Sequence, residues 1–126
     1  MGHADEALCI EGSEEAAVDY DTHLSRIKTG MSARNLEYDK AAYMISYIRT
    51  KMKPDSTVED KASYYSRLVF DISNELGIMA SFEWIPDEDG QLCASNILTL
   101  DGKAYSVNAA GSGKFKTYKW EEDIVL

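Results

Sequence analysis

The segment from Ala109 to Phe115 has residue types found in phosphate-binding loops, with two glycines, a serine and a lysine in close succession. A Walker A loop needs glycine where this chain has Asn108, serine or threonine where it has Phe115, and a helix directly afterwards. The residues from Phe115 onward instead indicate a strand. The segment therefore predicts a β-turn and no phosphate site.

Three carboxylates follow one another at Asp87, Glu88 and Asp89, and carboxylate oxygens are cation ligands. A calcium loop needs ligands at alternating positions and a glutamate at its twelfth position, where a count from Asp87 reaches Leu98. We therefore expect a solvated acidic turn over residues 86–90.

Acid–base chemistry would need titratable groups in a perturbed environment. Asp71 and Glu75 lie one helical turn apart, but we place them on an exposed face beside Arg67, which can pair with Asp71 at i,i+4. His23 has no serine or cysteine placed near it by the local sequence, and we expect it at the surface or half-buried. These patterns predict no catalytic residue, and we expect a protein that is not an enzyme.

Metal and disulfide chemistry is also weakly supported. Cys9 and Cys93 are far apart, and a reduced thiol pair is favoured over a disulfide, which stays possible. With His3 and His23 as the two histidines, a zinc site would need distant ligands to gather. We therefore expect no metal and no cofactor.

Apolar residues at helical spacing predict helices over about residues 13–29, 33–53 and 57–76. Ser13 is the expected N-cap of the first helix, and Gly30 its C′ residue. Other expected end signals are Ser32 and Pro54 around the second helix, and a Ser56–Glu59 capping box and Gly77 around the third.

After Gly77 the apolar period changes from 3.6 to 2, which predicts strands over about 78–85, 91–100, 103–110 and 115–120. Asp101-Gly102 indicates a two-residue hairpin, which would place Leu98 opposite Tyr105 and Asn96 opposite Val107. The order of elements predicts an α+β fold with helices on one face of a four-stranded antiparallel meander. We expect one domain over 13–126 after a flexible acidic tail over 1–12.

Charge is divided into blocks along the 126 residues, whose formal net charge is −9. Residues 1–21 carry −7, residues 22–53 carry +5, residues 54–100 carry −7, and the remainder is neutral. An acidic chain lacks the basic face that duplex nucleic acid or an anionic membrane requires. With no secretory signal or membrane span in the sequence, we expect a cytoplasmic protein that binds neither nucleic acid nor membrane directly.

Two surfaces could bind a partner protein. Leu36, Tyr43 and Tyr47 form a second apolar stripe on the second helix, which is either covered by the first helix or free as a contact surface rich in tyrosine. The acidic surface is either a solvated face or a mimic of phosphates that blocks a nucleic-acid-binding cleft. Its expected residues are Asp60, Arg67, Asp71 and Glu75 on the third helix, with Asp87, Glu88 and Asp89 in the turn.

The first functional hypothesis is a small acidic inhibitor that occludes a basic partner, such as a nuclease or another nucleic-acid-binding protein. Toxin-immunity proteins and phage-encoded anti-defence proteins share this size and charge, which is an analogy of class alone. The alternative is a structural module that forms homodimers or other homo-oligomers through the second helix or a sheet edge.

Overall fold

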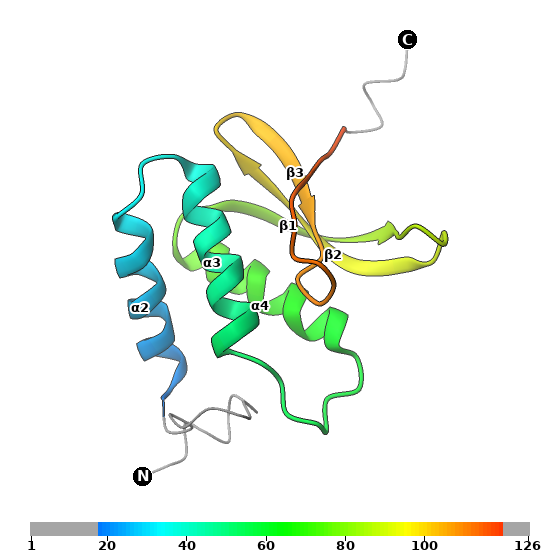
Figure 1. Cartoon of the computed structure of the whole chain (residues 1–126), viewed down its shortest axis with the longest axis horizontal. Helices are drawn as coiled ribbons and strands as arrows, with labels where there is room; N and C mark the ends of the chain where they lie inside the picture. The colour runs from blue at the N-terminus through cyan, green and yellow to red at the C-terminus, as the bar shows by residue number, and fades with distance from the viewer. Residues whose placement is uncertain (1–17, 120–126) are drawn as a thin grey trace.

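A computed structural model describes residues 18–119. Three helices come first, α2 (Tyr20–Ser32), α3 (Glu37–Lys51) and α4 (Lys61–Glu75). Four strands follow, β1 (Met79–Pro86), β2 (Leu92–Leu100), β3 (Lys103–Val107) and β4 (Lys116–Thr117), in one antiparallel sheet ordered β1-β2-β3-β4. The predicted α+β fold is confirmed (Figure 1). The predicted tail over 1–12 lies outside the described residues.

The predicted strand register is confirmed at both positions. Leu98 pairs with Tyr105, and Asn96 pairs with Val107. The connecting turn has Asp101 at φ 52° and Gly102 at φ 84°, the left-handed conformations that a type I′ turn requires at both central residues. The short local signal therefore determined how β2 and β3 align.

The core lies between α3, α4 and the sheet, while α2 packs on α3 from the outside (Figure 1). Its fully buried members include Ile27 from α2, Met44 and Ile48 from α3, Val69 and Ile72 from α4, and Leu98 and Leu100 from β2. Each helix therefore contributes an apolar stripe, and β2 contributes the centre of the sheet. None of the helices described between residues 18 and 119 has the length and apolar character to cross a bilayer.

The predicted ends of α2 were wrong. The helix begins at Tyr20 because Asp19 is its N-cap and accepts a hydrogen bond from Thr22 N at 2.9 Å. It continues through Gly30 to Ser32, so Gly30 is not a C′ residue. The absence of a side chain at Gly30 instead admits the Tyr43 ring from α3, because a Cβ there would lie 2.2 Å from Tyr43 Cζ.

The start of α3 was also predicted too early, at 33 instead of Glu37. Its N-cap residue Leu36 makes no side-chain cap, and Asp101 from the β2–β3 turn supplies one. The Asp101 carboxylate accepts hydrogen bonds from Glu37 N and Tyr38 N, while Asp101 N donates to Glu37 Oε1 at 2.7 Å. The arrangement is a capping box whose two halves are 64 residues apart.

Asp101→Gly is expected to lower the free energy of unfolding by about 1 kcal/mol, because α3 loses its cap while glycine still fits the positive φ. Asp101→Ala should cost about 1 kcal/mol more, since alanine disfavours that φ. Urea unfolding followed by circular dichroism measures both. A wild-type stability for Asp101→Gly would show that the cap contributes nothing.

The third helix begins at Lys61, and not at 57, because Asp60 and not Ser56 is its N-cap. The Asp60 carboxylate accepts hydrogen bonds from Ser63 N and Ser63 Oγ, and these hold the pKa of that carboxyl below its usual value. At the other end of the chain, β3 ends at Val107 and β4 spans Lys116–Thr117, both shorter than predicted.

Candidate functional site

The predicted acidic surface is divided between two ends of the molecule. Asp71 and Glu75 are exposed near the end of α4, just before β1 begins, whereas the acidic turn follows the end of β1. The eight residues of β1 separate the two groups by roughly 26 Å at about 3.3 Å per residue. Asp60 lies at the start of α4, and exposed Arg67 lies in its middle.

Asp71 and Glu75 lie close to α2. Burial, followed by the charges of Asp71, Glu75 and Asp21, raises the pKa of the Tyr20 hydroxyl. These carboxylates therefore act electrostatically on a half-buried tyrosine of α2. They form a second acidic surface, distinct from the turn.

The predicted tyrosine anchors are packing residues. Tyr47 is only 8% exposed, and a hydrogen bond of 2.8 Å joins its hydroxyl to His23 Nδ1. Tyr43 is half-buried against Gly30, with the Arg34 guanidinium 4.4 Å from its ring centroid. The α2 helix thus covers Tyr43 and Tyr47, which was one of the two interpretations of the stripe, whereas Leu36 is 56% exposed. His23 is buried, where we expected a more exposed residue.

The acidic turn is built around the side chain of Asp87. Its Oδ1 accepts hydrogen bonds from Asp89 N at 2.8 Å and Gln91 N at 2.9 Å. The bond from Gln91, and then that from Asp89, hold the pKa of the Asp87 carboxyl below its usual value. Asp87 therefore shapes the turn, while Glu88 and Asp89 are exposed on it.

Cys93 lies beside this turn on β2. Its Sγ donates to Asp87 Oδ2 at 3.6 Å, and burial together with the Asp87 charge raises the pKa of the thiol. A thiol with a raised pKa is a poor nucleophile and a poor metal ligand at neutral pH. Among residues 18–119, no group of three or more histidine, cysteine, aspartate or glutamate side chains is arranged to hold a metal ion.

Two large apolar side chains are exposed near the turn of the same β1–β2 hairpin, and the sequence patterns did not single them out. Trp84 is 57% exposed and Leu92 is 63% exposed. Trp84 pairs with Ala94, and Leu92 pairs with Pro86, so the two side chains are diagonal neighbours on the face of the sheet that carries Asn96. Phe82 extends this group, with its ring centroid 6.0 Å from that of Trp84.

Trp84 lies on the helix side of the sheet, because Asn96 on the same face donates to the Ser66 carbonyl of α4. Trp84 is exposed because the β1–β2 hairpin projects beyond the helices at that end (Figure 1). No local signal reveals where a helix stops covering a strand. We call Trp84, Leu92, Glu88 and Asp89 the hairpin site.

The loop that resembles a phosphate loop is closed by its own hydrogen bonds. Asn108 Oδ1 accepts from Ala110 N and Gly111 N, and the Asn108 carbonyl accepts from Gly111 N and Gly113 N. Arg49 of α3 donates to the carbonyls of Ala109 and Gly111. Four loop amides are therefore occupied, because Lys114 N also donates to Ser112 Oγ. No helix follows the loop among the described residues, so the predicted turn is confirmed and the loop does not have the structure of a phosphate loop.

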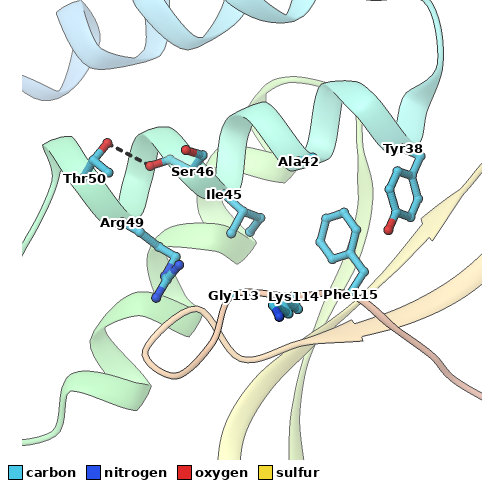
Figure 2. A pocket seen from close by; sticks show the side chains of 9 residues that line it. All are labelled: Tyr38, Ala42, Ile45, Ser46, Arg49, Thr50, Gly113, Lys114 and Phe115. Carbon is cyan, nitrogen blue, oxygen red and sulfur yellow. Dashed lines mark hydrogen bonds between the residues drawn. The ribbon is translucent and has the colours of Figure 1, made fainter.

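A cavity of about 400 Å³ lies between α3 and this loop. Figure 2 shows Arg49 pointing from α3 toward the loop, with Tyr38 and Phe115 facing one another at the other end. The two rings are 5.0 Å apart in an edge-to-face contact. The arrangement holds the loop against the helix.

The fold and the hairpin site define an α+β protein whose most distinctive surface is a projecting hairpin with apolar and acidic side chains. Comparisons with models of protein families, with curated proteins and with solved structures found no match to this chain.

Proposed function

We propose that this protein binds a basic partner protein through the hairpin site and inhibits it by occluding its functional surface. The observation that supports this function is the exposure of Trp84 and Leu92 on the hairpin whose turn carries the exposed Glu88 and Asp89. The combination has the composition of a protein interface, in which a few aromatic and apolar side chains supply most of the binding energy.

The acidic residues have a separate role in the proposed complex. Carboxylates at the rim of an interface speed the encounter with a basic protein and select against acidic partners, and their effect weakens with salt. The net charge of −9 acts in the same direction over longer range. A nucleic-acid-binding protein has the basic surface that such a hairpin would cover.

The turn geometry also favours binding without rearrangement. Because Asp87 accepts two hydrogen bonds from the turn backbone, Glu88 and Asp89 are presented on an ordered turn. A preorganised turn avoids part of the entropy loss that an unstructured acidic loop would incur on binding.

The test begins with affinity capture from the native host, identification of the partner by mass spectrometry and measurement of its binding to the purified chain. Trp84→Ala with Leu92→Ala should weaken binding by about 100-fold, since interface anchors contribute about 2 kcal/mol or more. Glu88→Lys with Asp89→Lys should slow association at least about tenfold at low salt and much less at high salt.

Asp71→Lys with Glu75→Lys is the matched control, because it makes the same charge change on the second acidic surface. Its association rate should stay close to that of the wild-type protein after allowance for net charge. Equal slowing by both pairs would show that the partner senses only total charge, and loss of binding by the control pair alone would assign the contact to α4. An acidic partner would overturn the proposal.

A further inference from the structure

Along β1, alternate residues direct their backbone hydrogen-bonding groups toward β2 and toward the outer edge of the sheet. Asp87 N donates to Gln91 O across the hairpin at 2.8 Å. In an antiparallel pair, residues that exchange backbone hydrogen bonds occur at every second position. With the observed register, Ser81, Glu83 and Ile85 therefore bond to β2, and the intervening residues direct their backbone groups away from it.

Those intervening residues are Ala80, Phe82, Trp84 and Pro86. Proline has no N–H to donate, and it is tolerated in a strand where the N–H would point away from the sheet. For Ala80, Phe82 and Trp84, the described part of the chain supplies no hydrogen bond to the outward N–H or C=O. Among residues 18–119, the result is a row of three donors and three acceptors without backbone partners beside the exposed Trp84 side chain.

We infer that the basic partner adds an extended strand to this edge of β1; this inference rests on the proposed function. Phe82 and Trp84 lie on the helix side of the sheet, and Glu83 lies on the other side. A strand that pairs here meets apolar rings on one side and a carboxylate on the other. The chemistry that fits is an extended segment in which apolar and basic residues alternate.

A second copy of this chain fits the edge less well. Antiparallel self-pairing centred on Phe82 keeps the helices of both copies on one side of the sheet and places Ala80 opposite Trp84. Each of the two copies carries a net charge of −9. Repulsion between two chains of the same net charge opposes this dimer. A basic segment meets no such repulsion.

The test uses a capped heptapeptide in which valine and lysine alternate, titrated into the full chain and followed by NMR and amide hydrogen exchange. Paired residues share a face, so the valines lie opposite Phe82 and Trp84, and their N–H groups are those that bond to β1. Methylation of the valine amide nitrogens should weaken binding at least about tenfold, because it removes several hydrogen bonds. Methylation of the lysine amide nitrogens, which point away, is the matched control and should have little effect.

Bound peptide should also slow hydrogen exchange at the Ala80, Phe82 and Trp84 amides, and Ala80→Pro should weaken binding while the chain stays folded by circular dichroism. If the two methylations weakened peptide binding equally, while the NMR chemical shifts of Trp84 and Asp89 still changed, strand pairing would be overturned. The proposed contact through the hairpin would remain intact. Edge amides protected without peptide, in a chain that sizes as a dimer, would assign the edge to a second copy. No binding of the peptide at low salt would overturn the inference, while the charge-reversal measurements above judge the proposed function separately.

Discussion

Asn96→Asp is expected to remove a large part of the free energy of unfolding at pH 7. Asn96 is fully buried, and its Nδ2 donates to the carbonyls of Ser66 at 3.0 Å and Ser81 at 3.1 Å. An aspartate of the same shape would direct a charged oxygen at two carbonyl oxygens. An unpaired buried charge costs about 3–5 kcal/mol, which is a large part of the roughly 5–15 kcal/mol that stabilises a domain.

The penalty should depend on pH in a defined direction. Burial favours the neutral acid and raises the pKa of an aspartate at 96 in the folded state above the value in the unfolded chain. The destabilisation is therefore largest above the folded pKa and shrinks as pH falls toward about 4, where the unfolded chain also binds the proton. Asn96→Ala removes the same hydrogen bonds without adding a charge. It should lower the free energy of unfolding by about 2–3 kcal/mol at neutral and at acidic pH alike.

Urea unfolding at pH 7 and pH 4.5 separates the two variants. The difference in unfolding free energy between Asn96→Asp and Asn96→Ala should narrow at the lower pH. If Asn96→Asp matched the wild-type stability at pH 7, the α4–sheet contact would have to be open to water at this position.

Gly30→Ala is expected to destabilise the protein by about 1–2 kcal/mol, although alanine is the better helix former. At an unconstrained helical position the change would stabilise by about 1 kcal/mol. Here the new methyl would lie 2.2 Å from the Tyr43 ring, which must leave its place between α2 and Arg34. Overpacking of this kind costs about 1–3 kcal/mol and outweighs the helix propensity.

A double-mutant cycle with Tyr43→Ala isolates this contact. Without the ring, Gly30→Ala should become stabilising by about 1 kcal/mol, so that the effect of one substitution changes sign with the other. Thermal and urea unfolding of the four proteins provide the cycle. The same sign in both backgrounds would show that Tyr43 does not determine the choice of glycine at 30.

The differences between predicted and observed helix starts have a common cause. Local sequence offers several residues able to cap, such as Ser32 and Ser56, and it does not reveal which one meets a free backbone N–H. The cap of α3 comes from Asp101, which becomes its neighbour only when the sheet has formed. The discrepancy at Gly30 is similar, because its reason is a tyrosine on another helix.

The features of the candidate site were also predicted only in part. Local pattern was enough to predict an acidic turn at 86–90 and the strands on either side of it. It did not predict that Tyr47 is buried or that Trp84 is exposed, because both depend on where α2 and α4 begin and end in space. A periodic pattern reports which face a side chain occupies, and not whether another element covers that face.

The sequence by itself determined the order of elements, the register between β2 and β3, and the division of charge into blocks. These properties depend on residue spacing, turn conformation and formal charge, all of which are local. Tertiary structure decided that the two acidic groups on α4 and the hairpin lie at opposite ends of β1, and that Trp84 and Leu92 stand beside only one of them. It decided this because exposure and proximity depend on the length of one element relative to the element packed against it.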